Sequence, residues 1–157
     1  MNRSKIFIII TMLLVIIIAG IGSKAEMVEN LGIVVGVGND VEKKGSDITY
    51  SVPFLLYTFE SKDKITTRVL TGKGRSIGET RETRQLISGK RLLIGLSKVF
   101  IFSQDVSEVG IKNILDVNHN NPDVNDRVLC IVCKGKAEDV LKYPVSGFQS
   151  SAEFIDG

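Results

Sequence analysis

The sequence is poor in several residue types that carry chemistry. It holds no tryptophan, three tyrosines, one histidine and two cysteines in 157 residues. With His119 as its one histidine and no second cysteine pair, the chain lacks the ligand set of a structural zinc site. No cysteine precedes Cys130, so the residue that carries the lipid of a lipoprotein, directly after the leader, is missing. We therefore expect an N-terminus without lipid.

Net charge is also nearly absent outside the first residues. Three of the 20 basic residues, Arg3, Lys5 and Lys24, lie within residues 1–25, which contain no acid. From Glu26 onward, the remaining 17 basic residues face 18 acidic ones. A near-neutral domain without a basic stripe lacks the electrostatic footprint that binds a polyanion. We therefore do not expect this chain to bind nucleic acid.

The N-terminal segment has the pattern of a targeting or anchoring sequence. Arg3 and Lys5 precede residues 6–21, an uncharged and strongly apolar run. Such a run at the extreme N-terminus, with basic residues in front of it, is typical of a signal peptide or a signal anchor. Cleavage after Ala25 and retention in the membrane both fit its length and its small residues. We expect residues 1–25 to deliver the rest of the chain to the far side of a membrane.

The remainder predicts an α+β fold, in which one small domain has a mixed β-sheet flanked by helices. Strands are expected at 31–37, 48–56, 66–71, 99–102 and 127–133. Helices are expected at 77–88 behind a Ser76 capping box, at 106–117 starting from Ser103 or Asp105, and at 136–143. The first two strands predict an antiparallel hairpin whose second strand, containing Pro53, lies at an edge or bulges. The later strand, helix and strand predict parallel pairing. Residues 26–145 form the expected domain, and residues 146–157 are expected to begin a further one.

Three patterns indicate chemistry, but each is incomplete. Cys130 and Cys133 have the C-x-x-C spacing, yet positions three apart on a strand face opposite sides, so we expect two buried, reduced thiols without a metal. Gly36-Val37-Gly38 lacks the third glycine of a dinucleotide loop, and Gly72-Lys73-Gly74 lacks P-loop spacing, so turn and cap roles are expected. No catalytic, cofactor or metal site is predicted.

Five segments, in this order, resemble one known family. They are 29–38, 72–79 with Arg84 further along, 98–102, 120–127 and 134–141. Together they resemble the N-terminal domain of the Ger(x)C family, the C subunits of bacterial spore germinant receptors. The chain departs from that family where a lipid-modified cysteine is usual, near Gly22, and in being less than half as long. The resemblance implies a non-catalytic component on the outer face of the spore inner membrane, without a cofactor, whose partners are the integral-membrane A and B subunits that sense small nutrients.

The densest group of polar turn residues is the best candidate for contact with such a subunit. It comprises Pro122, Asp123, Asn125, Asp126 and Arg127. Its acids lack the glycine and the distal glutamate of a calcium loop, so it predicts a solvated turn. Arg127 stands where a strand begins, so we expect its guanidinium to bind a carboxylate or exposed carbonyls and to hold the turn, with Asp123 and Asp126 as the nearest acids in sequence. We expect this turn to be part of a docking surface.

A second class of function stays open from the sequence. The chain also fits an exported small-molecule-binding module, with a pocket between sheet and helices, or a hydrolase with an unrecognised site. The identity of the nutrient does not follow from the residues.

Overall fold

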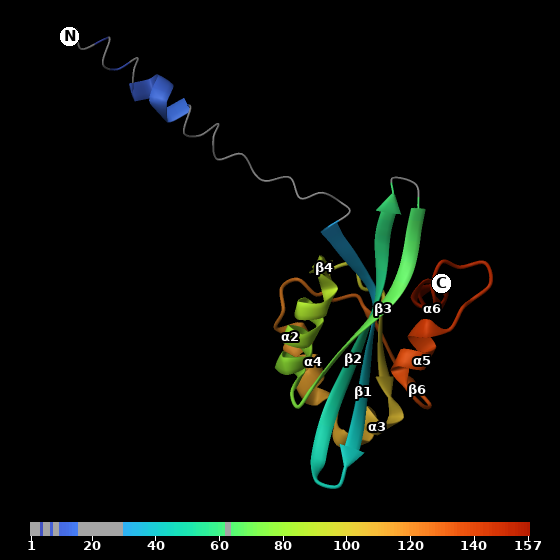
Figure 1. Cartoon of the computed structure of the whole chain (residues 1–157). Coiled ribbons are helices and arrows are strands. Elements are labelled where there is room, and N and C mark those ends of the chain that lie inside the picture. The colour runs from blue at the N-terminus through green and yellow to red at the C-terminus, as the bar shows by residue number, and fades with distance from the viewer. Residues whose placement is uncertain (1–3, 5–6, 8–9, 16–29, 62–63) are drawn as a thin grey trace.

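The computed structural model of the chain describes residues 4, 7, 10–15, 30–61 and 64–157. Residues 30–61 and 64–157 form a six-stranded sheet with helices on both faces (Figure 1). In chain order the elements are β1 (Leu31–Lys44), β2 (Asp47–Ser61), β3 (Lys64–Gly74), α2 (Ile77–Ser88), β4 (Arg91–Leu93), β5 (Val99–Ser103), α3 (Gln104–Val109), α4 (Lys112–His119), β6 (Leu129–Cys133), α5 (Ala137–Lys142) and α6 (Ser151–Asp156). The predicted mixed α+β class is confirmed.

The predicted anchor lies mostly outside the described residues. Of the apolar run 6–21, the structure describes residues 7 and 10–15, which are helical. In the part of the chain that the structure describes, no helix combines the length and the apolar character needed to cross a membrane.

The sheet is built around β1. This strand pairs antiparallel with β2 along the hairpin, and parallel with β4 through residues 31–33 and with β5 through residues 36–39. β3 continues the antiparallel part beside β2, and β6 lies parallel to β5. The strand order is therefore β3-β2-β1-β5-β6, with β4 beside β1. The predicted hairpin and the predicted parallel pair are both confirmed.

Pro53 lies on an interior strand, and the register shifts of its two ladders are at Val34/Gly36 and Phe59/Ser61, so neither the expected edge position nor a bulge at Pro53 is found. β2 is bordered by β3 on one side and by β1 on the other. The ladder with β1 is interrupted between the pairs Val37↔Phe54 and Asp40↔Ser51. Because proline has no N–H to donate, this gap is what lets an interior strand contain it.

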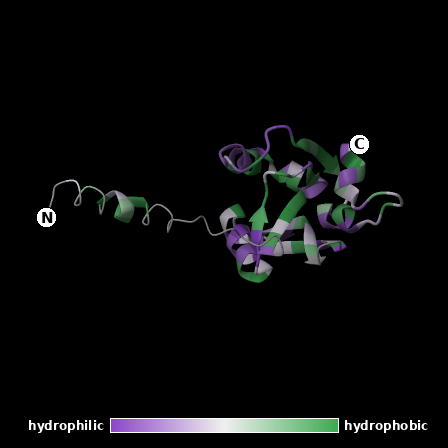
Figure 2. Cartoon of the chain, turned by 90° about the horizontal axis from the view of Figure 1, so that it is seen from above, coloured by the Kyte–Doolittle hydropathy of each residue, from purple (hydrophilic) through white to green (hydrophobic). Residues whose placement is uncertain are grey.

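The sheet separates two hydrophobic cores. All five residues of β5 are buried, and they alternate: Phe100 and Phe102 belong to the first core, Val99 and Ile101 to the second. Residues of α2, α3 and α4 pack on the first core, and residues of α5 and α6 on the second. Figure 1 shows α2 and α4 on one side of the strands and α5 and α6 on the other, and Figure 2 shows the hydrophobic residues gathered along the strands.

The glycines expected in turns and caps lie inside strands instead. Gly36 is in β1 and Gly72 is in β3. A Cβ on Gly72 would lie 2.1 Å from the carbonyl oxygen of Thr80 in α2, and one on Gly36 would lie 2.8 Å from a methyl group of Leu141 in α5. Glycine is required at position 72, because the obstructing atom belongs to the backbone of α2, whereas at position 36 the end of the flexible Leu141 side chain would have to move.

The second half contains more helices than the sequence predicted. The expected helix over 106–117 is two helices, because Gly110, at φ 114°, separates α3 from α4. Ser103 caps α3, as one of the two expected starts. Residues 146–157 include α6, in which Ala152 is fully buried in the second core. Asp156 in α6 also pairs with Lys98 at 3.0 Å.

Candidate functional site

The predicted docking turn joins α4 to β6 and lies at the surface. Four of its residues are exposed, namely Pro122, Asp123, Asp126 and Arg127, and Asn125 is half-buried. Val124 within it and Val128 after it pack against the first core. Two valines therefore pack this segment against the first core, and its charged side chains face the solvent.

Two asparagines, and not Arg127, shape this turn. Asn121 Oδ1 accepts the backbone N–H of Asp123 at 3.1 Å, and Asn125 Oδ1 accepts that of Arg127 at 3.0 Å. Within the described chain the Arg127 guanidinium forms no ion pair, so the expected pairing with Asp123 or Asp126 is wrong. The asparagines already satisfy the turn backbone, and an exposed ion pair adds little to stability in water. The guanidinium is left charged at the surface.

β6 comes directly after the turn and forms an edge of the sheet. It pairs with β5 on one side, and its other side carries no strand in the described part of the chain. Ile131 and Cys133 pack on the second core, whereas Leu129 is 43% exposed and Val132 61% exposed. The expected burial of this strand is therefore wrong. Its apolar run was read as an interior strand, but such a run does not show whether the strand has a neighbour on both sides.

The two cysteines are free, but they are not both buried as expected. Cys130 is exposed and Cys133 is half-buried. Partial burial raises the pKa of both thiols, and the charge of Asp40 raises that of Cys133 further. A raised pKa keeps a thiol protonated, which weakens it as a nucleophile and as a metal ligand. Among the described residues no three side chains are grouped to hold a metal ion, and His119 is exposed at the end of α4.

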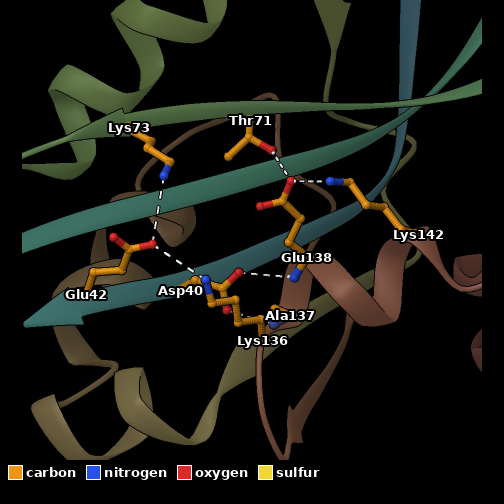
Figure 3. Close-up of polar contacts among 8 residues, drawn as sticks. All are labelled: Asp40, Glu42, Thr71, Lys73, Lys136, Ala137, Glu138 and Lys142. Atoms are coloured by element: carbon orange, nitrogen blue, oxygen red, sulfur yellow. Dashed lines mark hydrogen bonds and ion pairs between the residues drawn. The ribbon is translucent and has the colours of Figure 1, made fainter.

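A buried carboxylate ties β1 to α5 (Figure 3). Asp40 is 5% exposed, and its carboxylate accepts the backbone N–H groups of Ala137 at 2.7 Å and Glu138 at 3.0 Å. Burial raises the pKa of Asp40, although the two hydrogen bonds oppose this effect. The expected first strand ended at residue 37, so no local pattern placed Asp40 within β1 or gave it this role.

Charged residues around Asp40 make further contacts between β1, β3 and the start of α5 (Figure 3). Glu138 accepts the Thr71 hydroxyl at 3.0 Å and pairs with Lys142 at 2.6 Å. Burial raises the pKa of Glu138, but the bonds from Lys142 and Thr71 outweigh it and leave the pKa below its usual value. Glu42 on β1 lies 3.8 Å from Lys73 and 3.6 Å from Lys136. Each carboxylate of this cluster has a partner within the chain, as expected of a structural network.

Comparison with known proteins adds the family. Residues 24–157 match the family described as the spore germination protein N-terminal domain, a stretch that includes α6. The chain is also 23% identical over 156 residues to spore germination protein GerQC of Bacillus cereus, an alignment that covers 99% of this chain and 41% of that protein. No solved structure gives a significant match. The family match confirms the resemblance found in the five sequence segments. The chain belongs to the spore germination protein N-terminal domain family.

Proposed function

We propose that this chain is a non-catalytic component of a spore germinant receptor complex and acts in nutrient-triggered germination. The observation that carries the proposal is the family match over residues 24–157. The similarity to a protein named as a spore germination protein supports it. The chain spans 41% of the length of that relative.

We further propose that the domain lies on the outer face of the spore inner membrane. The support is the leader, in which Arg3 and Lys5 precede the uncharged residues 6–21. A basic start before an apolar run directs the downstream residues to the side opposite the cytoplasm. In this arrangement β1 begins a few residues after the membrane segment.

The docking surface is the turn together with the exposed edge that adjoins it. It consists of Pro122, Asp123, Asn125, Asp126, Arg127, Leu129 and Val132. An unpaired guanidinium beside an open apolar strand edge suits a partner segment that adds along β6 and supplies a carboxylate to Arg127. We propose that this segment belongs to an integral-membrane A or B subunit.

Co-purification tests the docking surface directly. The tagged full chain is expressed with the A and B subunits and recovered from membranes, and the amount of each subunit per chain is quantified. Arg127→Lys keeps the charge but loses the planar fork, and a charge-assisted bidentate bond contributes about 1.5 to 3 kcal/mol. We expect recovery of the subunits to fall about tenfold, since each 1.4 kcal/mol is a factor of about ten in affinity.

The same variant should fold as well as the wild type, because the Arg127 guanidinium pairs with nothing in the described chain. Val132→Asp, at a residue 61% exposed, should also reduce recovery without disturbing either core. Arg68→Lys, at an exposed position on β3, is the matched control. If Arg127→Lys recovers both subunits at the wild-type ratio, the turn has no part in docking.

A further inference from the structure

A cavity of about 550 Å³ lies on the first-core side of the sheet. Its walls come from β1 and β2, from α2 and α4, and from the segment that contains β4. Val37, Phe54 and Ile114 give it an apolar lining. Cavities of roughly 300 to 1,000 Å³ with apolar walls and a few polar groups are the usual sites of small molecules in proteins.

Arg84 brings a buried positive charge to this cavity. Its side chain crosses Gly72, whose added Cβ would lie 2.6 Å from Arg84 Cγ. The guanidinium carbon lies 4.0 Å from the centre of the Phe54 ring, and Nη1 donates to the Val52 carbonyl oxygen at 3.2 Å. Arg84 is 5% exposed, yet no carboxylate of the described chain pairs with it. A buried charge without a counter-charge is costly, so proteins normally pair it.

Two donors at this cavity have no acceptor. Among the described residues, the buried side-chain nitrogen and oxygen atoms without a hydrogen-bond partner are Arg84 Nε and Asn39 Nδ2, and both residues line the cavity. Asn39 is 2% exposed and shares its face of β1 with Val37 and Val41, which are in the first core. A buried donor that lacks an acceptor destabilises the folded protein, because it has lost its hydrogen bonds to water. A single group with acceptor atoms, bound in the cavity, could accept a hydrogen bond from each of these donors.

The charges around the cavity have the sign that attracts an anion. Arg81, Lys90 and Arg91 line it together with Arg84, against one acid, Asp123. Burial and, to a smaller extent, the neighbouring charge of Arg81 together lower the pKa of Arg84 to about 10. The guanidinium therefore stays charged at neutral pH, and an anion beside it would relieve both penalties.

We propose that this cavity binds a small organic carboxylate with an apolar body. The carboxylate accepts hydrogen bonds from Arg84 Nε and Asn39 Nδ2, and the apolar body lies against Val37, Phe54 and Ile114. A guanidinium suits a carboxylate because its planar donors match the two oxygens. The cavity and the docking surface share one residue, Asp123, but the inference does not depend on docking, because Arg127, Leu129 and Val132 do not line the cavity.

Phenylacetate is a suitable probe, with phenylacetamide as its neutral counterpart of the same shape. Binding to the purified full chain is measured by isothermal titration and by the shift of the unfolding temperature. We expect phenylacetate to bind and to raise the unfolding temperature with concentration, whereas phenylacetamide and inorganic phosphate do not. Equal effects of the acid and the amide, or no effect of either, would overturn the proposal, and binding of phosphate alone would overturn the choice of a carboxylate.

Variants locate the site. Arg84→Lys removes Nε and the planar fork, and Asn39→Asp places a negative charge in the cavity itself; we expect each to weaken phenylacetate binding at least about tenfold, the loss of one good charge-assisted bond. Arg68→Lys on β3, which does not line this cavity, should bind as the wild type does. Wild-type affinity in Arg84→Lys would refute the role of Arg84. If Arg84→Lys does not fold, Asn39→Asp decides, because added negative charge that leaves affinity unchanged rules out an anion at this place. The docking experiment is independent, so either proposal can fail while the other stands.

Discussion

Gly72→Ala tests whether α2 lies against β3 as closely as the structure shows. The added Cβ would be 2.1 Å from the Thr80 carbonyl oxygen and 2.6 Å from Arg84 Cγ. Carbon and oxygen in favourable contact are about 3.3 Å or more apart, so α2 would have to move by about 1 Å. Overpacking costs about 1 to 3 kcal/mol, and the upper end applies here because the obstructing atom belongs to the backbone.

The measurement is urea unfolding of the purified full chain, followed by circular dichroism. We expect the free energy of unfolding to fall by about 3 kcal/mol, a large part of the roughly 5 to 15 kcal/mol of an ordinary domain. At about 2 to 4 °C per kcal/mol for a chain of this size, the unfolding temperature should fall by about 6 to 12 °C.

Gly78→Ala is the matched control, because it adds the same methyl group within α2 itself. Its nearest neighbour would be Ser76 Oγ at 3.8 Å, an ordinary contact. Alanine is favoured over glycine in helices by about 0.5 to 1 kcal/mol, so this variant should be slightly more stable than the wild type. A Gly72→Ala protein as stable as the wild type would show that α2 does not rest on the strand backbone, and would remove the position given to Arg84.

Three further predictions concern the sulfur atoms, the buried acid and the N-terminus. Cys130→Ala should leave stability almost unchanged, whereas Cys133→Ala should cost about 1 kcal/mol by truncating a half-buried side chain; equal losses in urea unfolding would contradict the burial difference. Because the folded pKa of Asp40 is raised above its ordinary value of 3.8, the folded state holds this proton more tightly, and the unfolding free energy of the wild type relative to Asp40→Asn should fall as pH rises from below 3.8 through the folded pKa. A rise instead would mean that the bonds from Ala137 and Glu138 outweigh burial. The mature chain should carry no lipid, and an intact mass that includes a diacylglyceryl group would refute this.

Local patterns predicted the parts of the fold that local physics controls. The hairpin arises from two apolar runs around a polar loop, and the start of α2 from Ser76, which accepts the Glu79 N–H at 3.2 Å. The capping box differs in one detail, because the Glu79 carboxylate accepts the N–H of Arg75 at 2.7 Å and not that of Ser76. Residues close together in the chain determine such features, so they can be predicted from a short stretch of sequence.

The features that could not be predicted depend on contacts between distant segments. Asp40 meets Ala137 across 97 positions, and Arg84 meets Val52 across 32. No sequence pattern near Gly72 predicts that the backbone of Thr80 will lie against it. The candidate sites divide in the same way: the exposed turn was found from its polar residues, whereas the cavity donors lie on separate elements and come together only through the fold.

The position of β1 has a mechanical consequence. β1 is the strand nearest to the N-terminal segment, and it lies in the middle of the sheet with partner strands along both sides. The hydrogen bonds of these ladders run across the strand direction. A pull transmitted through the residues before Leu31 therefore acts along β1 and loads many of its hydrogen bonds in shear at once, where an edge strand would unzip pair by pair. If the proposed anchoring holds, this central position would make the domain harder to extract by force than an edge strand in the same place would.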